Sequence, residues 1–132
     1  MSTATAPTSK AMLWTGRVLS TLPVLLLIMS ATMKLMMAKE AVEGLKKFGY
    51  PDGVLFPLGI VEIICTALYA IPQTSVLGAI LLTGYLGGAT ATHLRVNDPF
   101  IPPVVIGVVL WLGLFLRDAR IRALIPFKRS SL

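Results

Sequence analysis

Charged side chains and cysteine are both scarce in this sequence, and each scarcity excludes classes of protein. Only 14% of the 132 residues are charged and 55% are apolar, whereas soluble domains carry about a quarter charged residues. The long apolar runs also exclude a disordered, collagen-like or disulfide-stapled chain. Because Cys65 is the only cysteine, the chain can form no internal disulfide, no CxxC redox pair and no cysteine-built metal site.

Motifs for several common chemistries are also missing. There is no Walker loop, no Rossmann glycine fingerprint and no G-x-S-x-G elbow, so nucleotide binding and esterase activity have no support. His93 is the only histidine, and one histidine with one cysteine does not make a zinc site, so we predict no metal ligands. The formal net charge of +6 would suggest nucleic acid for a soluble protein, but in so apolar a chain it indicates anionic lipid. We therefore expect a lipid bilayer as a partner and no nucleic acid.

Four apolar stretches follow one another along the chain, at residues 18–37, 54–71, 76–94 and 101–116. Each is close to the ~20 residues that a helix needs to cross ~30 Å of hydrocarbon, and the short connections favour sequential antiparallel packing. The predicted fold is an all-α, polytopic membrane protein, an antiparallel four-transmembrane-helix bundle within a membrane domain at 14–126. We expect residues 1–13 to form a disordered tail and residues 127–132 a basic tail.

The connection between the first two stretches has a different pattern. Apolar Ala41, Val42, Leu45 and Phe48 recur at three- and four-residue intervals, and charged residues fill the other side. This spacing predicts an amphipathic interfacial helix between transmembrane helices one and two.

An even number of spans places both chain ends on the same side of the membrane. The distribution of lysine and arginine favours a cytoplasmic location for both termini. A cleaved signal peptide is the alternative for the first stretch, because Lys10 and Arg17 precede it. That stretch is too long for a typical signal sequence and lacks a small-residue cleavage site followed by a polar domain, which favours a retained helix.

Glu62 is an ionisable residue inside the second stretch, about eight residues after its start. An ionisable group inside a bilayer costs roughly 2.5 to 3.5 kcal/mol on insertion scales, so its presence indicates a partner or a function. Antiparallel packing places Lys34 and His93, at the ends of the first and third stretches, near the same membrane face. We therefore predict a ligand-binding or proton-handling cluster of Lys34, Glu62 and His93. The alternatives are that Lys34 snorkels, His93 is interfacial and Glu62 is a protonated hydrogen-bonder between helices.

Further polar residues fall on the same predicted helix faces. Thr66 and Tyr69 follow Glu62 at four and seven residues, and Thr90 precedes His93 by three. We include all three among the candidate site residues.

Small residues mark one surface of the third stretch. Gly84 and Gly88 have the G-x-x-x-G spacing, and Gly87 lies between them. Such a surface lets another helix approach closely, and the partner helix belongs either to the same bundle or to a second copy of the chain. We predict that these three glycines are helix-packing residues.

Several short motifs resemble those of the DoxX-like family of small bacterial membrane proteins. They are WTGR at 14–17, MKL at 33–35, GYP at 49–51, GIVE at 59–62, LGAILLTGYLGGA at 77–89 and THLR at 92–95. The resemblance covers nearly all of residues 14–126, and its most specific parts are the last two motifs. It implies a four-helix bundle in the bacterial inner membrane.

The resemblance implies a function only in outline. The wider DoxX group includes a subunit associated with thiosulfate:quinone oxidation and members linked to membrane redox or thiol homeostasis. Members that act on disulfides use cysteine pairs, which this chain lacks, so a redox role here would need a bound quinone or a partner oxidoreductase subunit. No other cofactor is implied, and the sequence leaves open whether the chain is an enzyme.

Two hypotheses follow. In the first, Lys34, Glu62 and His93 bind a quinone or another small apolar ligand: Glu62 exchanges a proton, Lys34 sets its charge and His93 bonds a ligand oxygen. In the second, the chain is a non-enzymatic scaffold or assembly factor that acts through the surface of Gly84 and Gly88.

Overall fold

The structure is a computed structural model that describes residues 7–128, and within them all regular secondary structure is helical. In chain order the elements are α1 (Lys10–Leu35), α2 (Lys39–Lys47), α3 (Leu55–Ala70), the 3-10 helix η1 (Pro72–Thr74), α4 (Ser75–Arg95), α5 (Ile101–Arg117) and α6 (Ala119–Leu124). The predicted apolar stretches correspond in order to α1, α3, α4 and α5. The segments Lys10–Leu35 and Pro72–Arg95 are long and apolar enough to cross a membrane, and α3 and α5 are shorter apolar helices.

The helix α1 begins earlier than the sequence predicted. We expected a disordered tail over residues 1–13, but this prediction is wrong for Lys10–Leu13, which are helical. Ser9 caps the helix, because its hydroxyl oxygen accepts a hydrogen bond from the Met12 amide at 3.2 Å. That bond satisfies one of the free amides of the first turn, so no apolar periodicity is needed to start the helix there. Residues 1–6 and 129–132 of the predicted tails lie outside the described residues.

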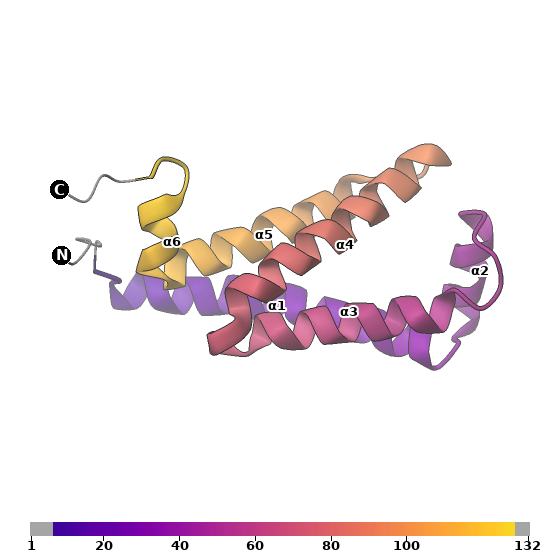
Figure 1. Cartoon of the computed structure of the whole chain (residues 1–132), viewed down its shortest axis with the longest axis horizontal. Coiled ribbons are helices and arrows are strands. Elements are labelled where there is room, and N and C mark those ends of the chain that lie inside the picture. Colours follow the sequence, from indigo (N-terminus) through magenta and orange to yellow (C-terminus); the bar gives the residue numbers. More distant parts are fainter. Residues whose placement is uncertain (1–6, 129–132) are drawn as a thin grey trace.

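The long helices form two pairs, which we call the α1/α3 arm and the α4/α5 arm. Within the arms α1 packs on α3 and α4 packs on α5, and between them α1 contacts α5 and α3 contacts α4. Long helices in contact run antiparallel, and the start of α1 and the helix α6 lie together at one end of the molecule, which we call the terminal end (Figure 1). From there the two arms diverge toward the end that carries α2 (Figure 1).

Glycines bring the two arms together at the terminal end. A Cβ at Gly16 of α1 would lie 2.8 Å from the carbonyl oxygen of Gly113 in α5. A Cβ at Gly78 of α4 would overlap the backbone of Tyr69 in α3. Backbones approach this closely only where a side chain is missing, so these glycines fix the contact between the arms.

The glycines that the sequence singled out do not have this role within the chain. A Cβ at Gly84, Gly87 or Gly88 would meet no atom within 4 Å, apart from its chain neighbours and the backbone of its own helix. No close approach within the chain requires a glycine at these positions, and their role in helix packing stays a prediction. They lie on the half of α4 that diverges from the other arm, where no close helix approach requires a glycine.

The core runs along the line where the four long helices meet. Its buried side chains come from all four of these helices and from α6, and include Leu27, Tyr69, Leu82, Leu110 and Ile121. On the outer surface, large apolar side chains are half exposed along each long helix, as at Leu25, Ile64, Ile80 and Val108. An apolar outer surface of this extent suits a lipid environment better than water.

Candidate functional site

A cavity of about 670 Å³ lies between the diverging arms, at the end that carries α2. Its walls come from α1, α2, α3, α4 and α5 and are mostly apolar, with Leu27, Leu45, Leu55, Leu58 and Ile106 among them. Cavities of this size with a few polar groups are typical binding sites for small molecules. The polar groups of its wall therefore define the candidate site.

Lys34 and Glu62 form an ion pair in the wall of this cavity. The Lys34 Nζ lies 3.0 Å from Glu62 Oε1, and the Glu62 side chain is only 2% exposed while that of Lys34 is 20% exposed. Gly59 allows the approach, because a Cβ at this position would lie 3.0 Å from the Lys34 Cβ. One turn of α3 separates Gly59 from Glu62, so the close contact of α1 and α3 aligns the pair.

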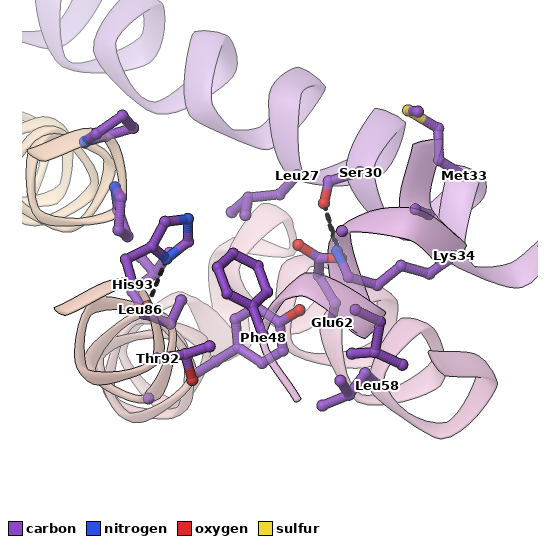
Figure 2. A pocket seen from close by; sticks show the side chains of 18 of the residues that line it. Leu27, Ser30, Met33, Lys34, Phe48, Leu58, Glu62, Leu86, Thr92 and His93 are labelled. Atoms are coloured by element: carbon purple, nitrogen blue, oxygen red, sulfur yellow. Dashed lines mark hydrogen bonds and ion pairs between the residues drawn. The ribbon is translucent and has the colours of Figure 1, made fainter. Parts of the chain in front are cut away.

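Ser30 bridges Lys34 and Glu62, and the sequence analysis did not identify it. Its hydroxyl donates a hydrogen bond to Glu62 Oε1 at 3.2 Å and accepts one from Lys34 Nζ at 2.6 Å (Figure 2). The available signal was its spacing of four residues before Lys34, which places both on one face of α1. The buried carboxylate thus receives two donors from the same helix.

Tyr85 approaches the same carboxylate from the other arm. Tyr85 and Glu62 both line the cavity, so the Tyr85 hydroxyl is a second polar group in the same wall region as the carboxylate. Sequence reasoning missed this residue as well, although it stands in the most specific motif of α4. The Glu62 carboxylate is bonded from α1, and Tyr85 adds a polar group to the cavity wall from α4.

His93 lines the cavity on the side opposite the ion pair. Its Nδ1 lies 2.6 Å from the carbonyl oxygen of Ala89, and its ring centroid is 4.7 Å from that of Phe48. Within residues 7–128, its ring makes no hydrogen bond with Lys34 or Glu62, and Figure 2 shows Phe48 between them in this view. The structure therefore joins two members of the predicted cluster and leaves the third across the cavity.

The two threonines and the tyrosine that were predicted to extend the cluster form hydrogen bonds outside it. Thr66 donates to the backbone carbonyl of Glu62 at 2.7 Å, and Thr90 donates to that of Leu86 at 2.8 Å. A hydroxyl in apolar surroundings takes the carbonyl one turn back when no better acceptor is near. Tyr69 is fully buried at the terminal end, where its hydroxyl bonds Ser20 and Leu110 rather than the site. The cavity wall contains none of these three residues.

The helix α2 forms one wall of the cavity and is tied to the end of α4. Lys47 Nζ lies 2.6 Å from Asp98 Oδ1, and the Tyr50 hydroxyl lies 2.8 Å from Thr92 Oγ1. The Arg95 guanidinium also donates to the carbonyl of Phe48 at 2.6 Å. These three contacts, which we call the α2–α4 tie, connect the two arms across the open end.

The described residues contain no group of three or more metal-ligating side chains. The arrangement instead presents a buried ion pair to an apolar, ligand-sized space. The helical fold, its two helices long and apolar enough to cross a membrane, and its apolar outer surface are consistent with a membrane protein. The DoxX-like family matches residues 18–114, and the chain belongs to this family, as its motifs predicted. Comparison with curated proteins and with solved structures gave no match.

Proposed function

We propose that this protein binds a quinone or another small apolar ligand in the cavity between the arms, in support of a membrane redox system. The observation that carries the proposal is the Lys34–Glu62 ion pair, which is buried in the wall of an apolar cavity of about 670 Å³. A ligand with an apolar body and one polar end fits such a space, because only its oxygen needs a polar partner.

Lys34 supplies the donor for that oxygen. An ammonium group has three N–H donors, and Ser30 Oγ and Glu62 Oε1 accept two of them. The third is available to a carbonyl or hydroxyl oxygen in the cavity. Glu62 and Tyr85, both in the wall, are groups through which a proton can reach or leave that oxygen.

We further propose that α1, α3, α4 and α5 each cross the bacterial inner membrane. The helices α3 and α5 have 16 and 17 residues, or about 24 and 26 Å at ~1.5 Å per residue. They are short for ~30 Å of hydrocarbon, a mismatch that local thinning of the bilayer accommodates. Arginines concentrated at the terminal end support cytoplasmic termini. The helix α2, with Ala41, Val42 and Leu45 half buried and its lysines exposed, then lies at the opposite interface.

The experiment compares quinone binding by the wild type with that by Glu62→Gln, which keeps the shape of the side chain and removes its charge. Binding of a short-chain ubiquinone to the protein in lipid nanodiscs is expected to fall about tenfold, or ~1.4 kcal/mol, because the neutral amide holds the Lys34 ammonium less firmly in position to donate to the ligand oxygen. Thr66→Val is the matched control, because Thr66 lies one turn further along α3 and outside the cavity wall. Equal binding by wild type and Glu62→Gln, with both folded, would refute the proposal.

A scaffold or assembly role is the second candidate, and the open surface at Gly87 favours it. A Cβ there meets no atom within 4 Å, and Gly87 does not line the cavity, whereas Gly84 and Gly88 do. Gly87→Leu therefore changes the outer surface of α4 and leaves the cavity alone. Loss of self-association or of a co-purifying oxidoreductase in this variant, with quinone binding retained, supports the scaffold over the ligand site.

A further inference from the structure

A second cavity, of about 340 Å³, lies at the terminal end of the molecule, at the opposite end from the cavity between the arms. Residues of α1, η1, α4, α5 and α6 line it, and its charged side chains are Arg17, Arg117, Arg120 and Asp118. We call it the arginine pocket. Three guanidinium groups and one carboxylate give its wall a formal charge of +2.

The single carboxylate of this pocket is already paired. Asp118 Oδ1 lies 3.3 Å from Arg120 Nε, Asp118 Oδ2 lies 3.3 Å from Arg120 Nη2, and the Arg120 amide donates to Oδ1 at 2.9 Å. No ion pair within residues 7–128 joins Arg17 or Arg117 to a carboxylate. The positive charge of the pocket therefore comes from Arg17 and Arg117.

The same glycine contact that joins the arms brings these two arginines together. A Cβ at Gly16 would lie 3.0 Å from the backbone nitrogen of Arg117, and Arg17 follows Gly16 directly. The Arg117 guanidinium is held in place, because Nε donates to Ser20 Oγ at 3.0 Å and the group lies 5.3 Å from the Tyr69 ring centroid. A guanidinium has five N–H donors, so its remaining donors stay available to an anion.

An apolar surface continues from the arginine pocket along α1. Trp14, Val18 and Leu22 are 60%, 54% and 55% exposed. Arg17 lies over the Trp14 ring, at 4.9 Å from its centroid, and exposed tryptophan is typical of the boundary between headgroups and hydrocarbon. A ligand held here would find a basic pocket for its anionic group and an apolar helix face for its hydrocarbon chains.

We propose that the arginine pocket binds the phosphate of an anionic phospholipid, whose acyl chains lie along the outer face of α1. Planar guanidinium groups suit phosphate oxygens because they donate two parallel hydrogen bonds. The inference is independent of the quinone site, which lies at the other end of the molecule.

The test measures the melting temperature of the purified protein in a neutral detergent with added phosphatidylglycerol, phosphatidylcholine of the same acyl chains, or inorganic phosphate. Phosphatidylglycerol is expected to raise it more than phosphatidylcholine, and inorganic phosphate is expected to have no comparable effect. Arg17→Gln is expected to weaken the phosphatidylglycerol affinity about fivefold, the effect of one cation beside an anionic headgroup. Lys10→Gln is the control, since Lys10 is an exposed cation of the same helix outside the pocket.

A second variant keeps the test decisive should Arg17→Gln fold poorly. Asp118→Asn removes the carboxylate of the pocket and retains a side chain that caps α6, so it is expected to raise the phosphatidylglycerol affinity. Equal stabilisation by both lipids, equal effects of Arg17→Gln and Lys10→Gln, or no gain in Asp118→Asn would each overturn the proposal. A matching response to inorganic phosphate alone would overturn the assignment to a lipid.

Discussion

The Cβ of Lys34 lies 3.0 Å from the position that a Cβ would take at Gly59, one turn before Glu62. Gly59→Ala is expected to push α1 away from α3, to destabilise the protein by about 1–2 kcal/mol and to weaken quinone binding. Unfolding in mixed micelles, together with the nanodisc binding assay, measures both effects. An unchanged free energy of unfolding would show that α1 can move away from α3 at Gly59 without loss of stability.

The ion pair itself is expected to show strong coupling. Lys34→Met leaves the buried Glu62 carboxylate without its cation and should destabilise the protein by about 3 kcal/mol. Adding Glu62→Gln should restore most of that loss, because a neutral amide costs less to bury than an unpaired charge. A double-mutant cycle on the free energies of unfolding tests this, and additive effects would contradict the pairing.

Glycines of the same helix are expected to respond in opposite ways. Gly78→Ala forces a methyl group into the Tyr69 backbone and should cost about 3 kcal/mol or more. Gly87→Ala meets no neighbour and should stabilise α4 by up to about 1 kcal/mol through helix propensity. The two variants are compared by thermal unfolding. Similar melting temperatures would argue against the close contact of α3 with α4.

The α2–α4 tie is expected to control access to the cavity more than stability. Lys47 is 60% exposed, and an exposed ion pair contributes about 0–1 kcal/mol. Lys47→Ala combined with Tyr50→Phe should therefore raise both the association and dissociation rates of a short-chain quinone, with little change in unfolding. Stopped-flow binding in nanodiscs measures the rates, and rates equal to those of the wild type would exclude a gating role.

Asp118 is expected to stabilise α6 in a pH-dependent manner. Burial raises the pKa of Asp118, but hydrogen bonds from the Arg120 side chain and amide lower it more, so the net shift is downward. A lowered pKa means that the stabilisation is complete above the ordinary value of 3.8 and is lost as the pH falls through the folded-state value. The melting-temperature difference between wild type and Asp118→Ala should therefore shrink on acidification from about pH 6 to about pH 3. A difference that grows instead would contradict the shift.

Sequence reasoning located the helices well because apolar length and short connections constrain a membrane chain strongly. It also paired Lys34 with Glu62, since the end of one helix must lie beside the start of the next. It could not determine how each helix is rotated about its axis. In a helix that is apolar on all sides the pattern of polar residues gives no inward face, so the direction of Tyr69 and the approach of Tyr85 stayed hidden.

The same limitation applies to the glycines. The G-x-x-x-G spacing led to the prediction that Gly84 and Gly88 are packing residues. The close helix contacts instead occur at the isolated glycines Gly16, Gly78 and Gly113. Whether a glycine is needed depends on the partner backbone opposite it, which sequence spacing alone does not reveal. His93 illustrates the point for side chains: its position along α4 was predicted, but its distance from the ion pair was not.

The two arms are joined by backbone contact at one end and only by side chains at the other. A small tilt of one arm about the joined end therefore changes the separation of the arms at the open end. A helix of 20 residues is about 30 Å long, and tilting it by about 5° about its fixed end moves its tip by roughly 2.6 Å. A substitution at the joined end that tilts one arm by a few degrees would therefore move the open end by about two to three ångströms and change the width of the cavity.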